Sequence, residues 1–225
     1  MNSPPPNEPP PNRQRRIELP PMPPRIAQLP RDSRGYPIPW NVLRRASGER
    51  AGEPIFTVND DRRAFRALRE RLCPICGGPL GRWQWFTGGP RSAFDEHGWY
   101  LDLPGHRECA EYALAVCPYL SATKYLRRID VPDMSGIGTP LLMDDTIDDN
   151  RPEVFVAVAS PRAEASLRGA PDGLGRLVTP YVRPARPLTG WQVWRHGERL
   201  EREAAVAAVR STMGAGWQPP DAEYG

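Results

Sequence analysis

The sequence predicts an α+β fold, and three observations support that prediction. Strand-like runs such as "VFVAVAS" (154–160) are mixed with helix-like segments such as "EREAAVAAVRSTM" (201–213). No fixed-period repeat relates these segments. Two short cysteine-containing motifs, "CPIC" (73–76) and "HREC" (106–109), are separated by 29 residues. Together they favour a small α+β domain organised around the two motifs.

Composition bounds the function. The chain has 225 residues, of which 29 are proline and 20 are glycine, and Lys124 is its single lysine. The net charge of +3 is too small to argue for nucleic acid by itself. No apolar run approaches the ~20 residues needed to cross a bilayer, and the N-terminus lacks the apolar core of a secretory signal. We therefore expect a cytoplasmic protein without membrane contact.

The composition shifts along the chain and suggests five segments. Ten prolines fall within residues 1–25, a segment with little to bury, so we expect disorder at the N-terminus. A cluster of carboxylates near 144–150 lacks the pattern of a Ca²⁺ loop and indicates a solvated loop. The expected segments are a proline-rich tail (1–28), a zinc-binding α+β domain (29–128), an acidic linker (129–152), a C-terminal α+β unit (153–214) and a second tail (215–225).

The first half of the chain contains an extended arm, a strand and a helix. Apolar residues alternate at Tyr36, Ile38 and Trp40, which indicates a short edge strand or extended arm within 29–43. "PIFTV" (54–58) predicts a strand, and Asn59 or Asp60 can cap a helix over about 60–72. The expected buried stripe of that helix is Phe65, Leu68 and Leu72.

Strands and helices are then predicted in order to the C-terminus. Gly214 is the expected stop of the last helix, and His196-Gly197 is the expected hairpin turn, because glycine supplies the positive φ of such turns. The expected elements are strands at 81–87 and 98–103, a helix from His106 to Pro118, strands at 154–160 and 176–182, a hairpin over 191–200 and a helix over 201–213.

The first cysteine motif suits a metal better than redox chemistry. A redox Cys-x-x-Cys pair begins a helix that lowers the pKa of its first thiol, but Gly77, Gly78 and Pro79 follow here and disfavour a helix. The same glycines allow the tight turn of a zinc knuckle. The second motif is expected on the first turn of a helix, with a two-stranded hairpin between the motifs. Knuckle, hairpin and helix together predict a treble clef-like zinc finger module with Zn²⁺ ligands Cys73, Cys76, His106 and Cys109.

Four protein ligands would fill the coordination shell of the ion, so the expected role of the Zn²⁺ is structural. No small-molecule cofactor is evident. Cys117, the fourth cysteine, is expected to be a small buried apolar residue. His97 is an alternative to His106, although it stands outside any paired spacing.

Two other functions are alternatives: an HNH-like nuclease and nucleic-acid binding. An HNH-like metal-dependent nuclease would use His97, in "DEHGW" (95–99), as its general base, but the helix start that should carry its second metal site is occupied by the zinc ligands. Nucleic-acid binding would rest on arginines and on tryptophans that stack bases. The candidate contacts are Arg62, Arg63, Trp83 and Trp85.

The motifs "LPRDSRGYPIPW", "RLCPICGGPLGR" and "HRECAEYALAVCPYL", with a late "GERLEREAAVAAV", resemble a family of uncharacterised bacterial and bacteriophage zinc-binding proteins. The resemblance covers about 29–127 well and the last third loosely. It implies zinc binding through the four ligands above and implies no activity. "GGPRSAFDEHGW" (88–99) departs from the family, which usually carries a Met-Cys pair after Gly-Pro. The sequence thus predicts a non-enzymatic zinc protein, of phage or mobile-element type, that binds a protein or a nucleic acid.

Overall fold

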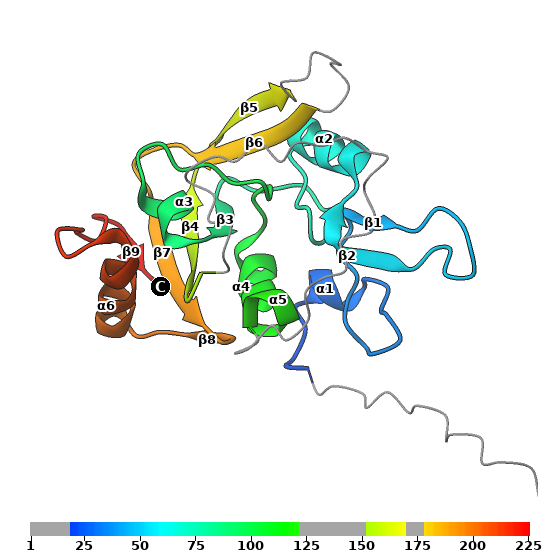
Figure 1. Cartoon of the computed structure of the whole chain (residues 1–225), viewed down its shortest axis with the longest axis horizontal. Coiled ribbons are helices and arrows are strands. Elements are labelled where there is room, and N and C mark those ends of the chain that lie inside the picture. Colours follow the sequence, from blue (N-terminus) through cyan, green and yellow to red (C-terminus); the bar gives the residue numbers. More distant parts are fainter. Residues whose placement is uncertain (1–18, 122–151, 170–177) are drawn as a thin grey trace, which may run out of the picture.

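The computed structural model describes residues 19–121, 152–169 and 178–225 (Figure 1). It is a mixed α/β fold with several antiparallel sheets and a Cys3His cluster. Its largest sheet has the strand order β3-β4-β7-β8, all antiparallel, and β9 adds to β7 in parallel. The strands are β3 (Gln84–Gly88), β4 (Phe155–Ser160), β7 (Gly190–Arg195), β8 (Glu198–Arg199) and β9 (Glu223–Tyr224).

Strand β4 is at the centre of this sheet and is buried along its whole length. Its side chains alternate between two faces. Val156 and Val158 belong to the larger core cluster, whereas Phe155, Ala157 and Ala159 belong to a second cluster. Because both faces are covered, the strand reads in the sequence as a continuous apolar run. The apolar run predicted a strand at 154–160, and β4 confirms that prediction.

Helices cover both faces of the sheet (Figure 1). Helix α4 (Arg107–Val116) packs its Ala110 and Leu114 against the face that carries Phe155. Helices α3 (Pro90–Phe94) and α6 (Arg202–Met213) contribute Ala93, Ala205, Ala208 and Val209 to the opposite cluster. None of the described helices combines the length and apolar character needed to span a bilayer.

Two smaller antiparallel sheets and three further helices complete the described fold. Asp60 caps α2, since its side chain accepts a hydrogen bond from the Arg63 amide at 3.1 Å. The smaller sheets pair β1 (Val42–Arg44) with β2 (Pro54–Asn59) and β5 (Ala163–Gly169) with β6 (Val178–Pro184), and the helices are α1 (Pro24–Ala27), α2 (Asp61–Glu70) and α5 (Pro118–Ser121).

The predicted turn and end of the C-terminal elements are confirmed. His196 and Gly197 have φ of 53° and 84° between β7 and β8, the left-handed pair that a two-residue hairpin turn requires. Gly214 ends α6 with a φ of 97°. Strand β5 and helix α3 were not predicted, because "AEASLRG" and "PRSAF" are short and carry few apolar residues.

Two predictions of local structure are wrong. Residues 98–103 do not form a strand, and Tyr100 makes only one isolated bridge, to Val182. Phe65 is 37% exposed, and the buried positions of α2 are Ala64 and Ala67. Of the two forms expected for residues 36–40, a short edge strand or an extended arm, the strand is not formed, and the segment makes an isolated bridge between Arg31 and Pro37.

Several helices and strands lie within or across the expected segments. The predicted N-terminal tail contains α1, in which Ile26 is 1% exposed, so residues 24–27 are part of the fold. The predicted C-terminal tail contributes β9 to the large sheet. Strands β3 and β4, expected in two separate units, pair along five residues each and share one core. Residues 1–18 of the first tail and 129–151 of the acidic linker lie outside the described residues.

Candidate metal centre

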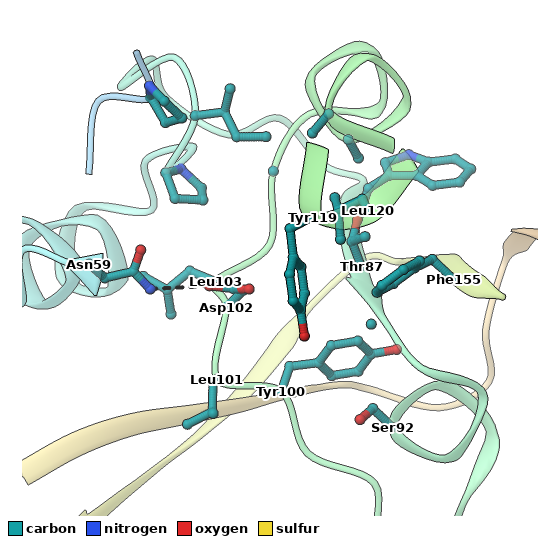
Figure 2. Close-up of a pocket in the computed structure, with 18 of the residues that line it drawn as sticks. Asn59, Thr87, Ser92, Tyr100, Leu101, Asp102, Leu103, Tyr119, Leu120 and Phe155 are labelled. Carbon is teal, nitrogen blue, oxygen red and sulfur yellow. Dashed lines mark hydrogen bonds between the residues drawn. The ribbon is translucent and has the colours of Figure 1, made fainter. Parts of the chain in front are cut away.

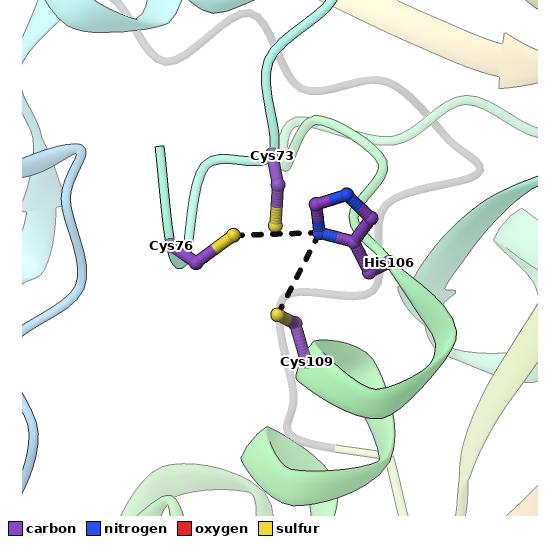
Figure 3. A group of neighbouring side chains, drawn as sticks. All are labelled: Cys73, Cys76, His106 and Cys109. Carbon is purple, nitrogen blue, oxygen red and sulfur yellow. Dashed lines mark hydrogen bonds between the residues drawn. The ribbon is translucent and has the colours of Figure 1, made fainter. Parts of the chain in front are cut away.

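The four predicted ligands come together at one point of the structure (Figure 3). Their ligand atoms, three Sγ and one histidine nitrogen, all lie within 4.8 Å of one another. His106 Nδ1 is 3.4 Å from Cys76 Sγ and 3.8 Å from Cys109 Sγ. Metal–ligand bonds of about 2.0–2.3 Å in a tetrahedron place ligand atoms roughly 3.3–3.8 Å apart. The residues therefore fit a tetrahedral ion of the size of Zn²⁺ with a small contraction.

The first cysteine pair is held by a tight backbone turn. The Gly77 amide donates to the Cys73 carbonyl at 2.8 Å, and the Cys73 amide donates to the Gly78 carbonyl at 2.8 Å. Gly77 has a φ of 73°, a conformation that L side chains rarely adopt. A Cβ on Gly77 would also lie 2.8 Å from the ring of Trp40. Gly77 is therefore required for two reasons: the turn needs its positive φ, and the Trp40 ring leaves no room for a Cβ.

The second pair is presented by the start of α4. His106 is the N-cap residue of α4, and Cys109 lies in its first turn and is fully buried. His106 Nε2 is 2.9 Å from the Pro79 carbonyl oxygen. Because a carbonyl can only accept, Nε2 carries the proton and Nδ1 presents its lone pair to the thiols. The knuckle that carries the first pair thereby orients the ligand atom of the second.

The expected hairpin between the pairs is reduced to a single bridge. Trp85 and Gly105 exchange both backbone hydrogen bonds, at 2.9 and 2.8 Å, while β3 pairs along its whole length with β4. Gly105 directly precedes His106, and a Cβ on it would lie 3.3 Å from Cys73 Sγ. This bridge therefore connects the large sheet to the ligand cluster.

Two thiols of the cluster, Cys73 and Cys109, have pKa values shifted in opposite directions. Hydrogen bonds with the Cys73 and Cys76 sulfurs, reinforced by burial, raise the pKa of Cys109 far above its ordinary value. Hydrogen bonds from Cys109 and Cys76 lower the pKa of Cys73. Cys73 therefore ionises more readily than Cys109, whose ionisation a neighbouring thiolate opposes, as expected for like charges in contact. A bound divalent cation would remove that opposition and allow all three to be thiolates.

The N-terminal arm supports the cluster from outside. The Trp40 and Asn41 amides donate to the Ile75 and Pro74 carbonyls at 2.8 and 3.0 Å, which ties the arm to the knuckle. Arg25 Nε of α1 is 2.9 Å from the Glu108 carboxylate of α4. A buried cluster of Ile26, Cys73, Cys109 and Tyr112 fills the space between these elements.

All four cysteines of the chain lie within the described residues, and none of them forms a disulfide. Cys117 is the C-cap residue of α4, half-buried and outside the Cys3His cluster. The alternative ligand His97 is exposed, with its amide bonded to the Asp95 carboxylate at 2.8 Å, and does not belong to the cluster. Within the described residues, the Cys3His group is the single cluster of three or more metal-ligating side chains.

The four residues predicted for nucleic-acid contact have different surroundings. Arg63 donates to the Trp40 carbonyl and has its guanidinium 5.8 Å from the Trp40 ring centroid, so it fixes the arm. Trp85 is 7% exposed, whereas Trp83 is 44% exposed. Arg62 is exposed on α2. Of the two tryptophans, Trp83 alone presents a ring to solvent.

A cavity of about 330 Å³ lies between the arm, β3 and the helices α4 and α5 (Figure 2). Tyr100, Tyr119 and Phe155 surround it, and the Asn59 amide donates to Asp102 at 3.1 Å on one side. The Tyr100 hydroxyl is buried without a hydrogen-bond partner, and burial raises its pKa. Among the described residues that line this cavity there is one carboxylate, that of Asp102, and no histidine.

No protein-family model, curated protein or solved structure matches this chain. The site is therefore interpreted from its own geometry. Sequence reasoning did not include the Pro79 carbonyl, which orients His106, because a backbone acceptor leaves no side-chain signal. It also passed over Arg82 and Arg107, which lie beside the two tryptophans; the adjacency of Arg82 to Trp83 in the sequence was an available signal.

Proposed function

We propose that the chain binds one Zn²⁺ in a treble clef-like site formed by Cys73, Cys76, His106 and Cys109. The observation that carries this proposal is the convergence of four N and S donor atoms within 4.8 Å. Three sulfurs and one imidazole are the donor set of structural zinc sites. Four protein donors complete a tetrahedron, so the ion would fix the fold and take no part in a reaction.

The energetic scale supports a structural role. Binding of structural Zn²⁺ contributes on the order of 10–16 kcal/mol in small zinc peptides, whereas the stability of a whole domain is typically about 5–15 kcal/mol. The ligands come from the knuckle and from the start of α4, and the arm is bonded to the knuckle through the Trp40 and Asn41 amides. Binding of the ion would therefore order this side of the molecule.

We further propose that the ordered surface binds a macromolecule, either a protein or a nucleic acid. A filled coordination shell leaves the metal no catalytic position, so the function of the site lies in the side chains it positions. The exposed aromatic and arginine residues next to the knuckle, Arg82 and Trp83, are the feature that supports a binding role.

The zinc proposal is tested with matched cysteine variants. The wild type and Cys117→Ala should each contain about one Zn²⁺ per chain, and Cys76→Ala should contain none after gel filtration, as measured by mass spectrometry of metals. Substitution of Co²⁺ adds a second readout, since thiolate-to-cobalt absorption should be present in Cys117→Ala and lost in Cys76→Ala. A full zinc equivalent in Cys76→Ala would contradict the ligand assignment.

A further inference from the structure

An open cleft lies beside the start of α4. Its volume is about 510 Å³, and it is bordered by the segment 81–85, the start of α4 and the adjoining ends of β7 and β9. Gly81 and Gly190 line it without side chains, and a Cβ on Gly81 would meet nothing within 4 Å. The absence of side chains at these positions keeps the cleft open to a planar ligand.

Trp83 stands at the mouth of this cleft with an accessible ring. Its exposure of 44% is the highest of any large apolar side chain in the described part of the chain. The guanidinium of Arg82 lies 4.8 Å from its ring centroid. An indole beside a guanidinium is a surface on which a planar aromatic group can stack.

The charged groups around the cleft are two arginines and one carboxylate. Arg82 makes no ion pair within residues 19–121, 152–169 and 178–225. Arg107 bonds Glu111 through Nε at 2.8 Å, and its Cζ lies 5.2 Å from the ring centroid of the buried Trp85. Glu223, exposed on β9, opposes them at the rim. Two guanidiniums on one side of a stacking surface can bind phosphate oxygens.

The surroundings of Trp83 fit a nucleic acid better than a protein interface. A protein interface requires about 800 Å² per partner around an apolar core, but Trp83 is the one exposed large apolar side chain among the described residues of this cleft. A single-stranded nucleic acid requires one exposed ring per base together with nearby positive charge. The cleft meets that smaller requirement.

We infer that this cleft binds single-stranded nucleic acid, with one base stacked on Trp83 and the adjoining phosphates on Arg82 and Arg107. This inference rests on the proposed macromolecule-binding function and specifies its partner and contact site. Glu223 limits the affinity, because its carboxylate repels the same phosphates. Trp85, buried under Arg107, positions that arginine and does not stack a base.

The experiment uses the full-length zinc-loaded chain and a fluorescein-labelled dT15 oligonucleotide, with fluorescence anisotropy at 50 and 200 mM salt. Loss of one stacked base weakens binding by about 5- to 150-fold, and that loss is expected for Trp83→Ala. Trp83→Phe should retain most of the affinity, since a phenyl ring still stacks. Arg82→Ala should weaken binding and flatten its salt dependence. Glu223→Gln should strengthen it.

Matched controls separate stacking from general attraction. Phe65→Ala removes another exposed aromatic ring, on α2, and Arg62→Ala removes an exposed arginine outside the cleft; both should bind dT15 as the wild type does. Equal affinity of Trp83→Ala and wild type, or tighter binding of a 15-base-pair duplex than of dT15, would overturn the inference. So would a wild type that binds neither oligonucleotide.

Zinc content measured on every variant keeps this outcome distinct from failure of the proposed function. If all variants hold one Zn²⁺ and none binds dT15, the cleft inference fails while the zinc site stands. The partner of the ordered surface would then be a protein.

Discussion

Gly77 shows how strongly one residue can determine the geometry of the ligand cluster. Its φ of 73° lets the chain turn directly after Cys76, and its lack of a Cβ lets the Trp40 ring cover the turn. This backbone turn also places the Pro79 carbonyl where His106 Nε2 can donate a hydrogen bond to it. A ligand motif alone would not guarantee any of these contacts.

Gly77→Ala should therefore destabilise the protein more than an ordinary glycine substitution. The strained φ and the 2.8 Å approach to Trp40 together should lower the free energy of unfolding by about 1–3 kcal/mol or more. Gly216→Ala is the control, because a Cβ there meets nothing within 4 Å and its φ is not in the left-handed region. Urea unfolding compares the two; equal midpoints would show that the turn tolerates a side chain.

At this scale the sequence predicts which ligands come together better than how they are oriented. The sequence spacing was sufficient to predict that four ligands meet, because each pair is local and the residue types are rare. The structure brings together the same four: Cys73, Cys76, His106 and Cys109. The choice of Nδ1 over Nε2 could not be predicted, since it depends on a carbonyl 27 residues away. Phe65 was misassigned because the stripe of α2 rotates by one position, to Ala64 and Ala67.

Among the elements, α1 is the least expected. It is a four-residue helix in a segment whose composition suggests disorder, yet Ile26 lies in the buried cluster with Cys73 and Cys109. Because prolines surround Ile26 in the sequence, composition alone does not indicate that this one apolar residue is buried. Helix α1 is held by Ile26 and by the Arg25–Glu108 ion pair, and the arm that follows it is held by the backbone bonds of Trp40 and Asn41.

Ile26→Ala should test whether α1 stabilises the Cys3His cluster, which Ile26 contacts through the buried cluster of Cys73, Cys109 and Tyr112. Removing a buried isoleucine leaves a cavity and typically costs about 2–5 kcal/mol. Gln28→Ala, on the exposed side of the same helix end, should cost little. We expect Ile26→Ala, and not Gln28→Ala, to release zinc faster to a chromogenic chelator. Equal release rates would show that α1 does not stabilise the Cys3His cluster.

The remaining differences between prediction and structure also arise at the scale of elements. Strand β4 was predictable because its burial on two faces produces an unbroken apolar run. Residues 98–103 have equally strand-like composition, but Tyr100 finds only one partner, Val182, and the segment stays irregular. Which strand pairs with β3 depends on residues 67 positions or more beyond it, and local patterns do not contain that information.

In the whole molecule, α4 lies between two buried clusters and belongs to both. Ala110 and Leu114 face the large sheet, while Cys109 and Tyr112 face the knuckle and the arm. The core of the sheet does not include the metal ligands. Loss of the ion should therefore act on one side of the molecule first.

Removal of zinc with a chelator should produce local unfolding, which hydrogen exchange can map. The Trp40 amide, which ties the arm to the knuckle, and the Cys73 and Gly77 amides, which close the knuckle itself, should lose protection. Amides of β4 and β7 at the centre of the sheet, such as those of Ala157 and Gln192, which stand opposite each other, should remain protected. Simultaneous loss at both places would indicate that the ion stabilises one cooperative unit.

Strand β7 pairs with β4 along one edge, and its other edge is covered twice. Strand β8 pairs with Trp194 and Arg195, and β9 pairs with Gly190 and Trp191, so each short strand covers one end. An uncovered edge next to a buried apolar strand invites the same edge of another chain to add to it, which is how sheet proteins aggregate. We therefore expect β9 to protect the protein from self-association, and a variant that detaches β9 to precipitate before it unfolds.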